Sequence, residues 1–220
     1  MRSGKSMLEP RWCVFTPEKQ VTPTSCMLIL PGRSQVGIHL ASAWIEVTDF
    51  PNTVFVVITP RAREWYPMPR DSKRQHRAVS GLPKARKTIE GVLDQIQEIY
   101  SIPRRRVAIA GFSAGGVMSV NVAAHSEQEL AGVVCHAGAI LEPHNLPECK
   151  EEHKEMPIVL THNLDDIVFD WEERYLPMVD ALEEKGYSFY PLEGEKGGHM
   201  ITYDDIISSS RIIAPRLGYK

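Results

Sequence analysis

The chain has 220 residues, of which 43% are hydrophobic and 24% charged, and its formal net charge at pH 7 is −3. This composition excludes an intrinsically disordered chain, which would combine low hydrophobicity with high net charge. The slightly negative balance also excludes a surface that as a whole attracts nucleic acid or anionic lipid. We expect one domain over residues 1–220, because α/β domains often reach about 250 residues.

No targeting or membrane segment is predicted. The first ten residues carry charged side chains with no apolar stretch behind them, unlike a secretory signal. The uncharged stretch 107–126 contains too many glycines and polar residues for a membrane-spanning helix. The four cysteines form no C-x-x-C pair, so no metal site is predicted. We expect a soluble, cytoplasmic protein without membrane insertion or a nucleic-acid partner; its oligomeric state is left open.

Apolar runs of strand length recur along the chain. The continuous runs lie at 26–30, 53–58, 106–110, 132–135 and 157–160. Runs without polar alternation are typical of parallel strands that are buried on both faces of a sheet. Two further runs, 12–16 and 187–192, alternate more and are predicted as outer strands.

Longer amphipathic segments lie between these runs. Helices are predicted at 35–47, 81–100, 114–125, 171–185 and 201–213. The clearest is 81–100, where apolar residues recur at spacings of three and four. Strands that alternate with helices predict a mostly parallel, doubly wound α/β sheet with helices on both faces. The polar stretch 141–156 is predicted as a loop too short for a large lid domain, and arginines 104–106 as exposed turn residues.

One segment, 61–87, is strongly basic. The segment contains nine basic residues and two acidic ones, Glu64 and Asp71, which gives a local charge of +7. The basic residues are Arg61, Arg63, Arg70, Lys73, Arg74, Arg77, Lys84, Arg86 and Lys87. A solvated loop and helix start is the simpler interpretation, and a patch that attracts an anionic substrate is the alternative.

The strongest chemical signal is a G-x-S-x-G motif centred on Ser113. A predicted strand enters it and a predicted helix leaves it, which is the context of a nucleophile elbow. Positions 111 and 115 are glycine, as expected where a side chain would collide with neighbouring backbone. The start of the following helix directs N–H groups towards any negative charge that develops at the serine. A glycine-rich turn that only binds phosphate is the competing interpretation.

A serine nucleophile needs a base, and His199 is the strongest of eight histidines. It follows Gly197 and Gly198, after the last predicted strand and before the final helix. In one known arrangement of a triad, the nucleophile comes first in the chain, then the acid, then the histidine. A histidine as late as His199 leaves room for an acid between Ser113 and itself. That acid should follow the strand at 157–160, where Asp165 and Asp166 are both available. Composition does not choose between them, because either could cap a following helix.

Together these motifs resemble the phospholipase/carboxylesterase family of α/β-hydrolases, which includes acyl-protein thioesterase-like enzymes. The resemblance rests on residues 111–116, 162–168 and 197–199 and extends over roughly residues 12–211. It implies an α/β-hydrolase fold without a large lid domain. The family acid lies four residues after a histidine at the strand end, here His162, which implies Asp166 as the acid of the triad.

The resemblance also implies an oxyanion hole and one wall of the substrate groove. The family carries a His-Gly pair after its first long buried strand, and the next residue donates a backbone N–H. Here Pro31 replaces the histidine before Gly32, so the implied backbone donors are Arg33 and Ala114. Trp65 lies on the loop that borders the groove in the family, which makes it a candidate substrate-binding residue; packing is the alternative.

The sequence therefore predicts a serine hydrolase for carboxylic esters or thioesters. The catalytic residues would be Ser113, Asp166 and His199, acting without a cofactor or metal. A small ester or thioester is the expected substrate, and it would be anionic if the basic segment 61–87 borders the groove. The alternatives are a peptidase of the same fold and a catalytically silent hydrolase fold that serves as a binding module.

Overall fold

The computed structural model of the protein describes residues 11–16, 22–67 and 76–220. A seven-stranded sheet with the order β1-β3-β2-β4-β5-β6-β7 forms its centre. Strands β2 to β7 run parallel, and only β1 joins antiparallel, against β3. The strands are β1 (Arg11–Phe15), β2 (Ser25–Leu30), β3 (Thr53–Thr59), β4 (Val107–Phe112), β5 (Gly132–His136), β6 (Ile158–Asn163) and β7 (Phe189–Gly194). The predicted mostly parallel sheet is confirmed, with β1 and β7 as the outer strands.

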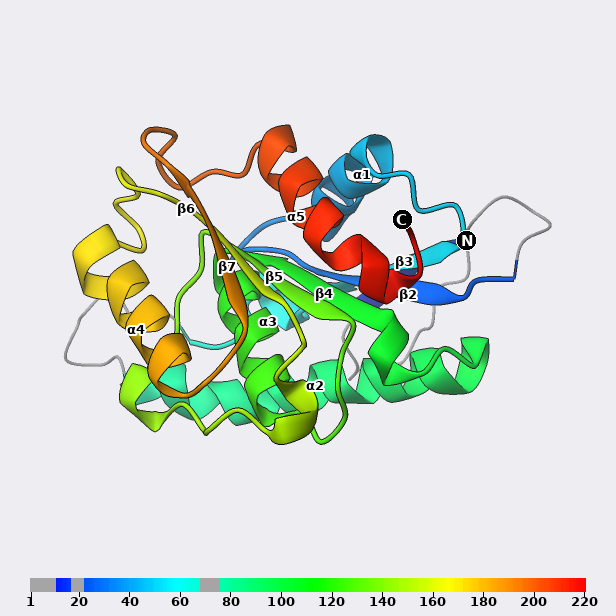
Figure 1. The fold of residues 1–220 in the computed structure, drawn as a ribbon, viewed down its shortest axis with the longest axis horizontal. Coiled ribbons are helices and arrows are strands. Elements are labelled where there is room, and N and C mark those ends of the chain that lie inside the picture. Colours follow the sequence, from blue (N-terminus) through cyan, green and yellow to red (C-terminus); the bar gives the residue numbers. More distant parts are fainter. Residues whose placement is uncertain (1–10, 17–21, 68–75) are drawn as a thin grey trace.

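Helices cover both faces of this sheet, as the doubly wound architecture predicts (Figure 1). The main helices are α1 (Gly37–Val47), α2 (His76–Tyr100), α3 (Ala114–His125), α4 (Leu176–Glu184) and α5 (Tyr203–Leu217). Helices α1 and α5 lie on one face, and α2, α3 and α4 lie on the other (Figure 1). Helix α2 begins five residues before its predicted start at position 81. The predicted helix 171–185 is instead a π-helical turn, Trp171–Tyr175, followed by α4.

The sheet separates two hydrophobic clusters because neighbouring side chains on a strand point to opposite faces. In β2, Cys26 and Leu28 belong to the cluster under α2 and α3, whereas Met27 and Ile29 belong to the cluster under α1 and α5. All four side chains are fully buried. Burial of each large apolar side chain stabilises the fold by about 1.5 to 3 kcal/mol. The apolar runs without alternation therefore reflect helices packed on both sides.

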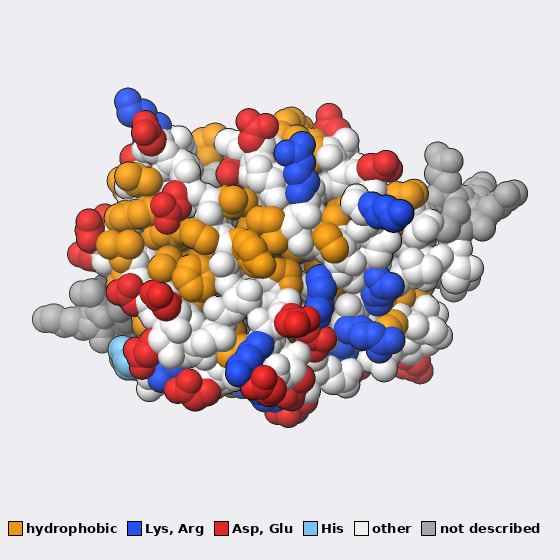
Figure 2. Space-filling view, in the orientation of Figure 1, with side chains coloured by type: hydrophobic (Ala, Val, Ile, Leu, Met, Phe, Trp, Pro, Cys, Tyr) orange, Lys and Arg blue, Asp and Glu red, His pale blue; other side chains and the backbone are white. Residues whose placement is uncertain are grey.

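The sheet is less well covered at its β7 edge. Along β7, Tyr190 is exposed and Leu192 is only half-buried. Figure 2 shows apolar side chains gathered over this edge and the neighbouring part of α5. Pro191 is also exposed on this strand, and a proline on an edge strand removes one hydrogen-bond donor from the edge. The alternation that marked 187–192 as an outer strand thus has a structural cause.

The prediction that arginines 104–106 are exposed turn residues holds only for Arg105, because Arg106 is half-buried and Arg104 is buried. Arg104 begins a short 3₁₀ helix, Arg104–Arg106, and is buried. Its guanidinium forms an ion pair with the Asp94 carboxylate at 2.5 Å and also donates to the carbonyl of Glu90. Arg104 thereby connects the turn before β4 with helix α2. By contrast, the predicted loop 141–156 is confirmed and contains two short 3₁₀ turns.

Across residues 11–16, 22–67 and 76–220, no helix combines the length and the apolar character needed to cross a lipid bilayer.

Candidate active site

Ser113 stands in a strained turn between β4 and α3. Its backbone has φ 55° and ψ −120°, a region that residues with a side chain rarely occupy. Two hydrogen bonds hold this conformation: the Ser113 N–H donates to the carbonyl of His136 at 2.8 Å, and the Val117 N–H donates to the Ser113 carbonyl at 3.0 Å. The turn places the hydroxyl at the carboxyl end of the parallel strands, where helix α3 begins.

The two glycines of the motif let backbone segments approach closely around Ser113. A Cβ on Gly111 would lie 2.1 Å from the Gly115 carbonyl oxygen, and a Cβ on Gly115 would lie 2.0 Å from the Leu30 carbonyl oxygen. Both distances are far below van der Waals contact, and both obstacles are backbone atoms. The geometry therefore agrees with the expectation that a side chain at position 111 or 115 would collide with neighbouring backbone.

An unbroken chain of hydrogen bonds links Ser113 to His199 and Asp166. His199 Nε2 lies 2.8 Å from Ser113 Oγ, and His199 Nδ1 lies 2.8 Å from Asp166 Oδ2. The other carboxylate oxygen of Asp166 accepts from the N–H groups of Val168 and Phe169, at 2.7 and 3.1 Å. The Asp166 side chain is fully buried, whereas that of His199 is 18% exposed. The imidazole is thus fixed on one side and open to the cleft on the other.

Asp165 lies next to Asp166 but has a different set of contacts. Its carboxylate accepts from the N–H groups of Gly198 and Gly197, at 2.7 and 3.3 Å. These hydrogen bonds lower the pKa of the Asp165 carboxyl, because they favour its charged form. Gly197 has a φ of 151° and Gly198 a φ of 60°, so the loop that Asp165 holds is one that favours glycine. Asp165 therefore positions the loop that carries His199, a role the sequence did not predict.

His162 contacts the backbone segment that binds Asp166. It is buried, its Nε2 lies 2.7 Å from the carbonyl oxygen of Phe169, and its ring stacks on Tyr175 at a centroid distance of 4.6 Å. Burial lowers the pKa of His162, which favours the neutral ring. A neutral ring protonated at Nε2 donates to Phe169, whose own N–H donates to Asp166. These contacts give His162 a structural role.

An open cleft of about 510 Å³ lies above Ser113. Its lining comes from the loop after β2, the end of β4 and the loops that carry Asp166 and His199. The lining residues are Gly32, Arg33, Gln35, Phe112, Ser113, Val168, His199, Met200 and Ile201. Apolar side chains thus form one part of the wall, and Arg33 adds a positive charge. That charge is paired with Glu64 at 2.8 Å, both side chains being well exposed.

Of the two predicted oxyanion donors, Arg33 lines this cleft and Ala114 directly follows Ser113. Ala114 is the first residue of α3, where an N–H has no carbonyl four residues before it within the helix. Gln35 Oε1 accepts from the Gly32 N–H at 2.9 Å and so shapes the loop that carries Arg33. No sequence pattern singled out Gln35, because its contact depends on how the loop folds back on itself.

Trp65 does not belong to the lining of the cleft. Its side chain is buried in the cluster beneath α2 and α3, and its Nε1–H donates to the carbonyl of Pro31 at 2.8 Å. The structure therefore places Trp65 behind the loop that precedes Arg33, where it packs and anchors the backbone. The packing alternative of the sequence analysis describes this position better than a groove wall does.

The basic segment 61–87 is described only in part, since Arg70, Lys73 and Arg74 lie outside the described residues. Arg61 and Arg63 are exposed on a short 3₁₀ turn beside the cleft loop. The carbonyl of Arg63 accepts from the Ser34 N–H at 2.9 Å, which ties this turn to the loop that carries Arg33. Arg77, Lys84, Arg86 and Lys87 lie on α2. Part of the segment thus contacts a loop of the cleft, although none of its described residues belongs to the lining.

In the part of the chain that the structure describes, no group of three or more His, Cys, Asp or Glu side chains is arranged to hold a metal ion. The described lining of the cleft instead supplies a hydroxyl, an imidazole and backbone N–H groups.

His136 holds the strained serine from the end of β5. Its carbonyl accepts from the Ser113 N–H, and its Nδ1 lies 2.7 Å from Thr161 Oγ1. Complete burial lowers the pKa of His136 to about 3, because the interior disfavours the charged imidazole. The folded protein therefore keeps His136 neutral at pH values where an unfolded chain would protonate it.

This difference predicts a loss of stability in acid. An unfolded histidine has a pKa near 6.5, so below that pH the unfolded state binds one proton more until the folded pKa is reached. His136 should then lower the free energy of unfolding by about 1.4 kcal/mol per pH unit below roughly pH 6.5. Urea unfolding at a series of pH values should show a shallower acid loss in His136→Gln than in the exposed control His144→Gln. Equal slopes in the two variants would show that His136 does not contribute.

A parallel sheet that carries a serine on a sharp strand-to-helix turn, with a histidine and an aspartate on later loops, defines an α/β-hydrolase fold. The family model described as Phospholipase/Carboxylesterase matches residues 45–183, which is more than half of the chain. The chain belongs to this family.

Individual relatives agree with the family. The chain is 30% identical over 96 residues to "Acyl-protein thioesterase 1 homolog 2" of Dictyostelium discoideum, which covers 42% of each protein. It is 34% identical over 87 residues to "Acyl-protein thioesterase 1" of Cryptococcus neoformans, over 38% of this chain and 37% of that one. The matched regions thus span about two fifths of these relatives. The crystal structure of esterase PE8 superposes with a TM-score of 0.83 at 20% identity, over 96% of this chain and all of the other, which confirms the fold.

Proposed function

We propose that the protein is a serine hydrolase that cleaves carboxylic ester or thioester bonds through an acyl-enzyme intermediate. The observation that carries the proposal is the chain of two 2.8 Å hydrogen bonds from Ser113 through His199 to Asp166, at the floor of an open cleft. A serine hydroxyl becomes a good nucleophile when an oriented imidazole can accept its proton.

The geometry supports a two-step reaction. Ser113 Oγ attacks the acyl carbon while His199 Nε2 accepts the hydroxyl proton, and the same nitrogen then donates that proton to the leaving alcohol or thiol. A water molecule next attacks the acyl-enzyme, again with His199 as the base, and releases the acid and free Ser113. Asp166 accepts from His199 Nδ1, which keeps Nε2 free for the proton and stabilises the imidazolium.

The negative charge of each tetrahedral intermediate needs donors that are already in place. We assign this role to the backbone N–H groups of Arg33 and Ala114. Ala114 begins α3, so the positive end of the helix dipole adds to its N–H. Preorganised donors of this kind contribute several kcal/mol to catalysis, because they need no reorientation as charge develops. No cofactor takes part in these steps.

The cleft favours a small substrate with an apolar acyl group and a polar or anionic leaving group. Val168, Met200 and Ile201 offer apolar contacts. Arg33 is paired with Glu64, and the exposed Arg61 and Arg63 on the adjoining turn leave an excess of positive charge. The relatives of Dictyostelium discoideum and Cryptococcus neoformans described above are both named acyl-protein thioesterases, which favours thioesters among the substrates. Few cysteines and no C-x-x-C pair favour a reducing compartment, so we propose that the protein acts in the cytoplasm.

Initial rates on a short substrate panel test this function. We expect saturable hydrolysis of p-nitrophenyl acetate and butyrate and of an acetyl thioester, because the cleft is open. A peptide p-nitroanilide should react far more slowly, since an amine is a poorer leaving group than a phenolate or thiolate. Cleavage of the anilide alone would favour the peptidase alternative, and no turnover of any substrate would contradict the proposal.

The charge at the cleft gives the panel an internal control. The KM of a thioester with an anionic leaving group should rise with salt, because screening weakens the attraction to exposed arginines. The KM of neutral p-nitrophenyl butyrate should stay constant over the same salt range. A KM that does not respond to salt for either substrate would exclude the anionic preference while leaving the hydrolase proposal intact.

A further inference from the structure

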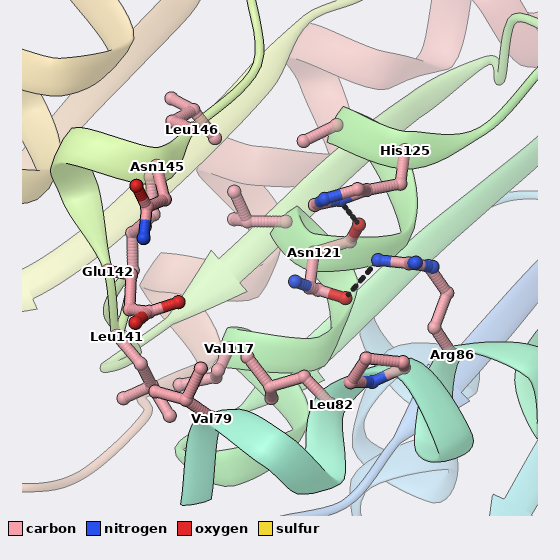
Figure 3. Close-up of a pocket in the computed structure, with 14 residues that line it drawn as sticks. Val79, Leu82, Arg86, Val117, Asn121, His125, Leu141, Glu142, Asn145 and Leu146 are labelled. Atoms are coloured by element: carbon pink, nitrogen blue, oxygen red, sulfur yellow. Dashed lines mark hydrogen bonds between the residues drawn. The ribbon is translucent and has the colours of Figure 1, made fainter. Parts of the chain in front are cut away.

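A second cavity, of about 170 Å³, lies on the side of the sheet away from α1 and α5 (Figure 3). Helices α2 and α3 and the loop that follows β5 form its walls. It shares no lining residue with the cleft above Ser113. It is therefore separate from the candidate active site.

The floor of this cavity is apolar. Nine of its fourteen lining residues carry aliphatic side chains: Val79, Leu82, Pro83, Val117, Val120, Ala124, Ile140, Leu141 and Leu146. In Figure 3, Val79, Leu82 and Val117 lie beneath the polar side chains. An apolar cavity of about 150 Å³ is known to hold a molecule as large as benzene, so this space suits a branched aliphatic group of four or five carbons.

One wall of the cavity carries a positive charge that has only long contacts. The guanidinium of Arg86 is 22% exposed and lies 3.9 Å from Glu90 Oε1 and 3.3 Å from Asn121 Oδ1. Because the Asn121 oxygen faces Arg86, its NH₂ group points towards the cavity (Figure 3). Burial lowers the pKa of His125, so this neighbour adds no full charge at neutral pH. Arg86 and Asn121 together offer N–H donors suited to a carboxylate.

The opposite wall carries a negative charge. The half-buried Glu142 lies on the loop after β5, and in Figure 3 its carboxylate points into the space between the two walls. Among the described residues, the carboxylate forms no ion pair or hydrogen bond with a side chain. Asn145, on the same side, adds an amide. An ammonium group of a ligand would give this carboxylate an ion-pair partner.

We propose that this cavity binds a small aliphatic zwitterion of the α-amino acid type, about the size of leucine. The carboxylate of the ligand would accept from Arg86 and Asn121, its ammonium would donate to Glu142, and its side chain would lie on the apolar floor. A simple anion would leave the Glu142 charge uncompensated, and a simple amine would face Arg86. Only a ligand that carries both charges matches both walls.

Calorimetric titration with three related ligands tests the proposal. The probes are L-leucine, 4-methylpentanoate, which lacks the ammonium group, and L-leucinamide, which lacks the carboxylate. L-leucine should bind saturably, and each analogue should bind about tenfold or more weakly, since a hydrogen-bonded charge is lost in each. Methyl resonances of Leu82, Val117 and Leu141 should shift during the titration. Equal affinity for all three ligands, or no saturation by L-leucine up to its solubility limit, would overturn the proposal.

Charge-neutral variants sharpen the test. Arg86→Gln and Glu142→Gln should each weaken L-leucine binding about tenfold, and Glu142→Gln should also narrow the preference for L-leucine over 4-methylpentanoate. Arg77→Gln and Glu98→Gln remove exposed charges from α2 outside the cavity and should leave binding unchanged. Loss of affinity in all four variants would contradict the assignment. The binding measurements do not depend on turnover, so they stand apart from the proposed hydrolase function.

Discussion

Replacing Ser113 with alanine is expected to lower kcat for p-nitrophenyl butyrate by a factor on the order of 10⁴ to 10⁶. The hydroxyl is the atom proposed to form the acyl-enzyme, and no other described hydroxyl lies in the cleft lining. The fold should survive, because Ser113 directly precedes helix α3 and its backbone hydrogen bonds do not require the hydroxyl. Steady-state kinetics and circular dichroism on the same preparation measure both quantities.

Two comparisons make this result specific. Ser80→Ala removes an exposed hydroxyl from α2 and should leave kcat unchanged. The double variant Ser113→Ala with His199→Ala should be no slower than Ser113→Ala alone, because members of a triad act as a unit and their losses do not add. Near-normal turnover in Ser113→Ala would exclude a serine nucleophile at this position.

The second large effect is expected at Asp166. Replacing it with asparagine should lower kcat about 10⁴-fold, because an amide favours the wrong tautomer of His199 and no longer stabilises its positive form. The side chain is buried and three of its hydrogen bonds hold His199 and the backbone of Val168 and Phe169. The KM should change little, since the carboxylate does not line the cleft.

The neighbouring aspartate provides a matched control. Asp165→Asn keeps one of the two oxygens that accept from the N–H groups of Gly197 and Gly198, so one hydrogen bond to the loop remains and kcat should fall only severalfold. The two variants make the same exchange of a carboxylate for an amide at adjacent positions. A general effect of lost charge would therefore lower kcat equally in both. A larger loss in Asp165→Asn than in Asp166→Asn would reverse the assignment of the acid.

The motif around Ser113 could be predicted from sequence because its constraints are local. A strand, a serine flanked by glycines at two positions and a helix are enough to define the turn, and the glycine requirement follows from backbone contacts. The sheet was predictable for a similar reason, since continuous apolar runs indicate strands buried on both faces. The choice of Asp166 over Asp165 depended on family resemblance, because both residues occupy the same loop.

Other features depend on how loops and turns fold in three dimensions and left no sequence signal. Trp65 reaches the carbonyl of Pro31, and Gln35 folds back on Gly32, only after the loops are assembled. Arg104 looked exposed because it begins a run of three arginines, but its partner Asp94 lies ten residues earlier on α2. The π-helical turn at 171–175 was likewise hidden, because its periodicity resembles that of the helix that follows.

Covalent labelling of Ser113 is the most direct measurement of the proposed chemistry. The protein is treated with a fluorophosphonate probe, digested and analysed by tandem mass spectrometry. Stoichiometric phosphonylation should be found at Ser113, and it should vanish in His199→Ala while persisting in the Ser80→Ala control. An unmodified Ser113 in the folded protein, or a label at another serine, would contradict the proposal that this hydroxyl is the activated nucleophile.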